Sequence, residues 1–325
     1  MRFIWGLYTI PSVNILEIIF PVFAIALIGY LLALKSVLRV SDINGISRFV
    51  FIVAIPTLLF NSLAKIELPP DLNWQFLLSY YLALFIVFGL GMWLGDKRFG
   101  FLIQERGVFG MGASYSNLLL VGLPIISAGL GEEAVLPLFM LISIHSAIQF
   151  FMVSVFAERG VDNGRSAISI TFQTVKNLAR NPIIIGLVLG LIFNLFSIPI
   201  PTAVDTTIEI ISRAALPSAL IVLGASLATY KIAGHVSEVW TIIGLKMVMQ
   251  PLLVWLLAFI VFDLNPLWGA VAVMSAGMPV GINAYMMAQK YQVCLESMST
   301  AVLLSSILAI FSQSVLLTIF MGIFR

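Results

Sequence analysis

The sequence predicts an all-α polytopic membrane protein, with ten transmembrane helices in two inverted five-helix repeats. Three observations predict this fold: the apolar composition, an internal repeat, and paired interruptions in the fourth and ninth helices. Of the 325 residues, 61% are hydrophobic and only 10% are charged, and a soluble domain of this size could not bury so much apolar surface. We therefore expect the whole chain to lie in a lipid bilayer.

The predicted helices are apolar runs of about 20 residues, the length that spans a bilayer, between charged residues and turn residues. In order, they cover 14–34, 43–64, 74–95, 107–130, 133–156, 182–200, 203–229, 236–261, 266–289 and 294–324. The longest polar joint, 158–180, separates the first five helices from the last five. We therefore predict a first repeat over 1–157, a short linker over 158–180 and a second repeat over 181–325.

The loops of such a chain fall into two sets, one on each side of the membrane, and their positive charges are unevenly divided. One set contains Lys35, Arg39, Arg48, Lys97, Arg98, Arg106, Arg159, Arg165, Lys176, Arg180, Lys231 and Lys290. The other set contains Arg2, Lys65 and Arg325. Because lysine and arginine concentrate in cytoplasmic loops, we expect both termini outside the cell and the 158–180 linker in the cytoplasm.

A repeat is visible when the sequence is shifted by 161 positions. The shift places Pro21 on Pro182, Gly29 on Gly190, Leu34 on Leu195, Ser36 on Ser197, Ala54 on Ala215, Pro56 on Pro217, Leu59 on Leu220, Ala64 on Ala225 and Ser114 on Ser275. Matching prolines and glycines without a gap indicate duplication. Because each unit has an odd number of spans, the second must enter the membrane from the opposite side, an arrangement common in secondary transporters.

The fourth and ninth spans carry residues that interrupt helices, at equivalent places in the two units. Proline removes a backbone donor, glycine permits an open turn, and asparagine can bond to freed backbone or to a ligand. Half-helix N-termini meeting at the crossing would favour a carboxylate. Alternatively, the asparagines only cap the breaks and the prolines only kink the helices. The candidate site residues are Asn117, Gly122 and Pro124 in the fourth span, and Pro279, Gly281 and Asn283 in the ninth.

Two other polar residues are candidates for the site. Lys246 lies inside the eighth span, where its long side chain could either reach the interface or place its ammonium group on a substrate carboxylate. Asn61, one turn beyond Pro56, could face the crossing or bond to a neighbouring helix. We expect Glu209 and Arg213, spaced i to i+4, to form a structural ion pair.

The sequence lacks the residues that several classes of protein need for their function. There is one cysteine, Cys294, and the two histidines, His145 and His235, are far apart in sequence, so we expect no metal site, no cofactor and no enzymatic activity. No basic and aromatic run suggests a nucleic-acid partner. A receptor that binds a ligand in the same pocket, and a symporter coupled to sodium or protons, remain as alternatives.

Four segments in order resemble the auxin efflux carrier family, the bacterial permeases related to the plant PIN auxin exporters. They are Asn117 to Pro124 (NLLLVGLP), Arg180 to Pro182 (RNP), Pro217 to Leu227 (PSALIVLGASL) and Met278 to Tyr291 (MPVGINAYMMAQKY). The resemblance extends over nearly the full chain. The short linker matches the bacterial branch, because plant members carry a large hydrophilic loop there.

The resemblance implies a fold like that of PIN, bile-acid-symporter and NhaA carriers. Helices one, two, six and seven would form a scaffold, and helices three to five and eight to ten a transport domain that moves like an elevator. The implied substrate is a small organic anion, such as a malate-like, malonate-like or auxin-like carboxylate. We expect the protein to lie in the plasma (inner) membrane. A homodimer through the scaffold helices is a further expectation.

Overall fold

The computed structural model describes residues 15–66, 73–159, 176, 180–230 and 234–323. Most of the predicted 158–180 linker lies outside this part of the chain. The described residues form helices and no strand, apart from one isolated bridge between Ser116 and Val280. The predicted all-helical class is therefore confirmed for the part of the chain that the structure describes.

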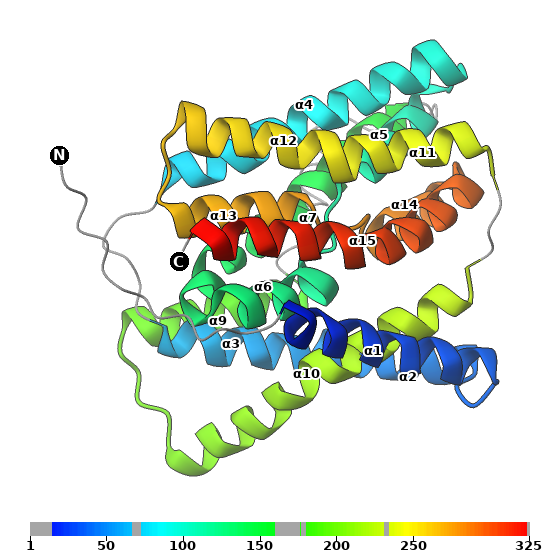
Figure 1. The fold of residues 1–325 in the computed structure, drawn as a ribbon. Coiled ribbons are helices and arrows are strands. Elements are labelled where there is room, and N and C mark those ends of the chain that lie inside the picture. The colour runs from blue at the N-terminus through cyan, green and yellow to red at the C-terminus, as the bar shows by residue number, and fades with distance from the viewer. Residues whose placement is uncertain (1–14, 67–72, 160–175, 177–179, 231–233, 324–325) are drawn as a thin grey trace.

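The helices alternate between long continuous rods and short consecutive pieces (Figure 1). In the first half they are α1 (Ile15–Leu34), α2 (Val40–Phe49), η1 (Val50–Ala54), α3 (Ile55–Lys65), α4 (Trp74–Phe99), α5 (Ile103–Ser114), η2 (Leu118–Gly122), α6 (Leu123–Leu130), η3 (Glu132–Ala134) and α7 (Val135–Arg159). In the second half they are α9 (Pro182–Leu195), α10 (Thr202–Ala228), α11 (Val236–Gly244), η4 (Leu245–Met249), α12 (Gln250–Trp255), η5 (Leu256–Val261), α13 (Pro266–Ala276), α14 (Ile282–Tyr291) and α15 (Leu295–Ile323).

Within the described residues, seven helical runs are long and apolar enough to span a membrane, and three shorter apolar helices cover Leu118–Leu130, Pro182–Leu195 and Pro266–Ala276. The shorter runs lie in the fourth, sixth and ninth predicted spans. The sixth ends at Leu195 rather than at position 200, because Ser197 adopts a left-handed conformation with φ of 48°. A left-handed residue closes a helix C-terminus.

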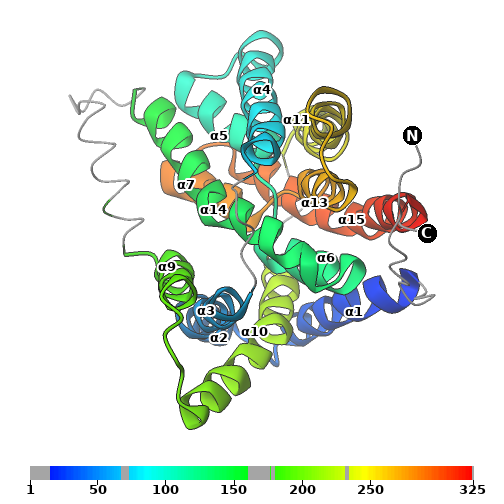
Figure 2. The same cartoon turned by 90° about the vertical axis from the view of Figure 1, so that its left-hand side faces the viewer.

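The helices pack in two groups, seen from two sides in Figures 1 and 2. Group 1 consists of α1, α2, η1, α3, α9 and α10, which lie along the bottom of Figure 1. Group 2 consists of α4 to α7 and α11 to α15, with their η segments. Contacts between the groups come from α6 and α15 against α1, from η2 against α10, and from α7 against α9. The groups are therefore separate packing units that share one interface.

Glycines bring the helices of group 1 close together. A Cβ on Gly190 of α9 would lie 2.8 Å from the backbone oxygen of Phe60 on α3. A Cβ on Gly186, one turn earlier, would lie even closer, 2.4 Å from the backbone oxygen of Pro56. Small residues four apart let helices approach closely in lipid, where association depends on packing rather than on hydrophobic burial.

Large apolar side chains are exposed on both groups. Phe20 on α1, Trp74 on α4 and Leu252 on α12 are 69%, 64% and 60% exposed. Extended apolar surface of this kind marks contact with a partner or with lipid. Together with the long apolar helices, it identifies the surface as one suited to a bilayer.

The first helix of each half ends in the same way. Ser36 and Ser197, 161 positions apart, both have positive φ, at 57° and 48°. Each turn is closed by a bond from the following amide: Val37 to the oxygen of Leu32, and Ile198 to that of Phe193, both 2.9 Å. The local structure at these two positions therefore follows the sequence repeat.

Candidate functional site

The first helix break separates α5 from η2. The chain leaves the helix after Ser114, runs extended through Tyr115 and re-enters a helix after Asn117. The Asn117 side chain caps this new helix, because its Oδ1 accepts from the amide of Leu120 at 3.3 Å. Gly122 and Pro124 follow inside η2 and α6, and both are buried. This break therefore directs a helix N-terminus, with its positive dipole end, at the middle of group 2.

The second break separates α13 from α14. Pro279 cannot donate a backbone bond, and α13 ends three residues before it, at Ala276. Helix α14 begins at Ile282 after Gly281, which has an extended backbone and provides no side-chain cap. A Cβ on Gly281 would overlap the ring of Tyr115, so this position needs glycine for close approach. A second helix N-terminus therefore begins beside the first break.

The two breaks are hydrogen-bonded to each other through their backbones. The amide of Asn117 donates to the oxygen of Pro279 at 2.9 Å, and the amide of Gly281 donates to the oxygen of Tyr115 at 3.0 Å. These bonds flank the antiparallel bridge between Ser116 and Val280. Backbone groups freed by a helix break are tolerated at membrane depth only where protein or water satisfies them. Each break satisfies groups of the other.

Side chains from neighbouring helices bond to the bridge residues. His145 Nε2 on α7 accepts from the amide of Ser116 at 3.2 Å, and Ser305 Oγ on α15 accepts from the amide of Val280 at 3.0 Å. The Tyr80 hydroxyl on α4 donates to Ser116 Oγ at 3.1 Å. Because a backbone amide only donates, the bond from the Ser116 amide to His145 Nε2 requires a neutral His145 with its proton on Nδ1.

Tyr115 joins the two breaks through its side chain. Asn283 Nδ2 donates to the Tyr115 hydroxyl at 2.6 Å, and this hydroxyl also bonds to Ser146 Oγ on α7 at 2.7 Å. The predicted site residue Asn283 is therefore close to the first break. One amide proton of Asn283 is used within the crossing.

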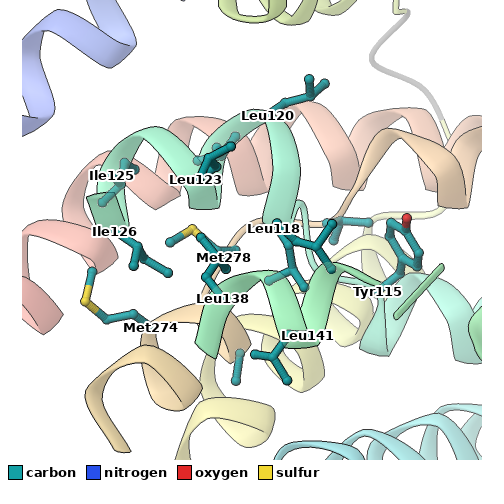
Figure 3. Close-up of a cluster of buried hydrophobic side chains, with 14 of the residues drawn as sticks. Tyr115, Leu118, Leu120, Leu123, Ile125, Ile126, Leu138, Leu141, Met274 and Met278 are labelled. Carbon is teal, nitrogen blue, oxygen red and sulfur yellow. The ribbon is translucent and has the colours of Figure 1, made fainter. Parts of the chain in front are cut away.

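Apolar side chains surround the crossing, as Figure 3 shows. They come from both breaks and from α7, and they include Leu118, Leu120, Leu123, Ile125, Ile126, Leu138, Leu141, Met274 and Met278. Each of them is buried. Dipoles and hydrogen-bond donors act more strongly in such a setting than in water.

The crossing has unused donors. Asn117 Nδ2 is buried and has no hydrogen-bond partner among the described residues. The N-terminus of α14 has no side-chain cap. Only two of the four half-helices, those after the breaks, present N-termini here, because α5 and α13 end at the crossing with their C-termini. The half-helix N-termini expected at the crossing are therefore those of η2 and α14.

The other two site candidates lie away from these donors. Lys246 lies in η4, is completely buried, and donates to the backbone oxygen of Ala276 at the end of α13. Its ammonium group therefore does not reach the membrane interface. Asn61 lies on α3 in group 1, where its buried Oδ1 has no partner among the described residues.

Sequence reasoning missed Tyr115, Ser116 and Ser305 as parts of the site. The first two could have been found, because they directly precede Asn117 in the interrupted segment. Ser305 is one of many small polar residues of the last span, and nothing local distinguishes it. The predicted ion pair between Glu209 and Arg213 is present at 2.5 Å on exposed side chains. In the described chain, no group of His, Cys, Asp and Glu residues is arranged to hold a metal ion.

Comparisons with known proteins give a family for this architecture. The model of the Membrane transport protein family matches residues 14–317. A Rhizobium meliloti protein named "Putative malonate transporter" is 23% identical over 303 residues, covering 91% of this chain and 93% of its own. A Methanothermobacter thermautotrophicus protein named "Uncharacterized transporter" is 24% identical over 296 residues, covering 91% and 95%. The chain belongs to the Membrane transport protein family, which includes the auxin efflux carriers.

Proposed function

We propose that the protein is a secondary transporter that carries small organic anions and holds the carboxylate where the two broken helices cross. The observation that carries this proposal is the backbone pairing of Tyr115 and Asn117 with Gly281 and Pro279. This pairing places the uncapped N-terminus of α14 and the unpaired side-chain Nδ2 of Asn117 in one apolar setting. Amide donors and helix N-termini suit a carboxylate.

A malonate-like dicarboxylate is the first substrate class to test. The name of the Rhizobium meliloti relative supports this choice. The crossing offers amide donors and two helix N-termini, and such a site binds a small acid without a bulky ring pocket. The Asn117 and Asn283 side chains lie on opposite breaks, so that each could hold one end of a short substrate.

The transport mechanism that we propose is an elevator movement of group 2 against group 1. In this proposal the chain is a ten-helix inverted repeat, and its first, second, sixth and seventh predicted helices correspond to group 1, the scaffold. The shared turn at Ser36 and Ser197 supports the repeat, and the separate packing of the two groups supports their relative movement. We also propose that the exposed apolar face of group 1 forms a homodimer.

The proposed orientation in the plasma membrane has both termini outside. It rests on the concentration of lysine and arginine in one set of loops. Cysteines introduced singly at Lys65 and Lys290, with Cys294 replaced by serine, should react from opposite sides of intact cells. Labelling of both from the same side would contradict this orientation.

The proposal is tested by uptake of labelled malonate into proteoliposomes. Because hydrogen bonds to charged groups contribute about 1.5–3 kcal/mol, Asn117→Ala and Asn283→Ala should each lower uptake roughly 10-fold or more. Asn44→Ala, at an exposed position on α2, is the matched control and should keep the wild-type rate. If the folded double variant, Asn117→Ala with Asn283→Ala, took up malonate at the wild-type rate, the site would lie elsewhere. If the wild-type protein bound malonate without transporting it, the result would favour a receptor.

A further inference from the structure

The C-terminal end of α13 is closed by an unusual partner. Within the last turn, the amide of Gly277 donates to the oxygen of Val273 at 2.9 Å, and that of Met278 to the oxygen of Ser275 at 3.4 Å. The oxygen of Ala276, the last residue of α13, accepts from the Lys246 ammonium group. A cation at this position complements the negative end of the helix dipole.

Lys246 is in an unusual electrostatic position. Its side chain is completely buried in group 2. The ion pairs of the described residues join Lys65 to Asp205, Lys97 and Arg106 to Asp96, and Arg213 to Glu209, so none of them includes Lys246. A buried charge without an ionic partner is costly. The carbonyl of Ala276, at the negative end of the α13 dipole, offsets part of this cost.

Buried amide groups lie along the same region. Gln250, one turn after Lys246, is completely buried, and neither of its side-chain polar atoms has a partner among the described residues. Gln313 on α15 is likewise buried without partners in the described chain, and its Nε2 lies 3.3 Å from where a Cβ on Gly277 would be. The end of α13 is thus a polar region enclosed within group 2.

The positive charge is present in only one half of the repeat. The shift of 161 places Phe85 opposite Lys246, and Phe85 is an exposed apolar side chain on α4. The sequence repeat therefore does not by itself account for a lysine at this position.

In transporters with broken helices, unwound carbonyls and half-helix C-termini coordinate the coupling sodium ion or proton. Here such a C-terminus holds the ammonium group of the chain itself. We infer that Lys246 is a tethered cation that takes the place of a free sodium ion at the α13 break. This inference rests on the proposed function, and it makes anion binding independent of any inorganic cation at this position. Lys246 acts as a positioning residue, because it holds the oxygen of Ala276. Ala276 lies three residues before Pro279, whose carbonyl accepts from the amide of Asn117.

The first test does not depend on the substrate. Thermal unfolding of purified protein is followed in choline, sodium and methylammonium chloride at equal ionic strength. Wild type and the matched surface variant Lys290→Gln should unfold at the same temperature in all three salts. Lys246→Gln should be less stable in choline and should regain several degrees in sodium or methylammonium, because a ligand that binds the folded state stabilises it. Lys246→Arg, which keeps the charge, should not respond to sodium.

The second test measures malonate uptake by the same proteins. Wild type should transport at equal rates in sodium and choline. Lys246→Gln should lose at least 10-fold in choline and recover several-fold in sodium or methylammonium. Cation-independent wild-type rates in Lys246→Gln would overturn the inference, and so would a sodium requirement of the wild type.

The two tests separate this inference from the proposed function. If wild type transports no organic acid, the proposed function fails, while the salt dependence of unfolding still decides the role of Lys246. If Lys246→Gln does not fold, the wild-type titration with sodium decides alone: a specific stabilisation by sodium at millimolar concentration would show a free cation site and overturn the inference.

Discussion

Cys294 is partly buried at the start of α15, and its Sγ donates to the backbone oxygen of Glu105 at 3.8 Å. Burial, with a smaller contribution from the carboxylates of Glu105 and Glu238, raises the pKa of this thiol to about 12. The thiolate is the reactive form. At pH 8, alkylation by N-ethylmaleimide should therefore be roughly three orders of magnitude slower than for an ordinary thiol.

The pH dependence of this reaction gives a second measurement. Below the raised pKa, the thiolate fraction and the rate should rise about tenfold per pH unit between pH 8 and 10. A cysteine at exposed Lys290, in a Cys294→Ser background, should level off near its ordinary pKa. Mass spectrometry at successive times measures the alkylated fraction of each cysteine. Labelling of native Cys294 as fast as this control would contradict the buried setting.

Gly281 tests the close approach of the two breaks. A methyl group there would lie 2.5 Å from Tyr115 Cε1, so Gly281→Ala must push the breaks apart. Overpacking of this kind costs about 1–3 kcal/mol, and we expect a lower unfolding temperature in detergent together with lower malonate uptake. Gly89→Ala on α4, where nothing lies within 4 Å, is the control. Equal behaviour of the two variants would argue against a tight crossing.

Among the helical elements, three π-helical segments are each followed by a proline. η1 precedes Pro56, η2 precedes Pro124 and η4 precedes Pro251, each by two residues. Proline lacks the amide for an i to i−4 bond, and its ring collides with the carbonyl of the preceding turn. The wider π turn relieves this collision without ending the helix. In η4 the same widening forms the turn that carries Lys246.

The left-handed turns at the ends of α1 and α9 are testable elements. Serine in this conformation is strained, and glycine is not. The left-handed conformation costs a non-glycine residue about 1–2 kcal/mol, and glycine loses more backbone freedom on folding, so Ser36→Gly and Ser197→Gly should each stabilise the protein by less than this amount. Ser47→Gly inside α2 is the opposite control and should destabilise the protein. Thermal unfolding in detergent distinguishes these outcomes, and a loss of stability in both turn variants would contradict the assigned backbone.

The helices and both breaks could be predicted from the sequence because their signals are local. The predicted runs 74–95 and 236–261 correspond to α4 and to α11 through η5. The interruption next to Asn117 follows from the residue types of this segment, Asn117, Gly122 and Pro124, which disfavour regular helix. The fourth span begins at Ile103 rather than at position 107, and this start is less visible in the sequence because charged residues such as Arg106 lie in its first turns.

The contacts of the site could not be predicted, because they join distant parts of the chain. Asn283 bonds to Tyr115 across 168 positions, and Ser116 bonds to His145 across 29. Both depend on the way that α7 and α14 pack against the first break. Likewise, the sequence left open whether Lys246 reaches the interface, since only packing shows that its ammonium group meets Ala276.

At the scale of the whole molecule, the interface between the two groups determines whether group 2 can move. One contact across it is between Tyr230, after α10, and Tyr285 on α14, with ring centroids 4.6 Å apart. A comparable contact within group 1 joins Phe60 on α3 and Phe193 on α9, with centroids 5.1 Å apart. Both pairs are aromatic. An elevator movement of group 2 would separate the first pair and leave the second pair unchanged.

Cross-linking these two pairs tests the elevator proposal. In a Cys294→Ser background, cysteines at Tyr230 and Tyr285 should be joined by a short bismaleimide, and malonate uptake should then fall at least 10-fold because group 2 is tied to group 1. The same reagent on cysteines at Phe60 and Phe193 should leave uptake unchanged, since both helices belong to group 1. Cross-linked fractions are quantified by mass spectrometry in the same proteoliposomes. Full uptake with the first pair cross-linked would exclude rigid-body movement across this interface and would require the anion to pass by local opening at the crossing.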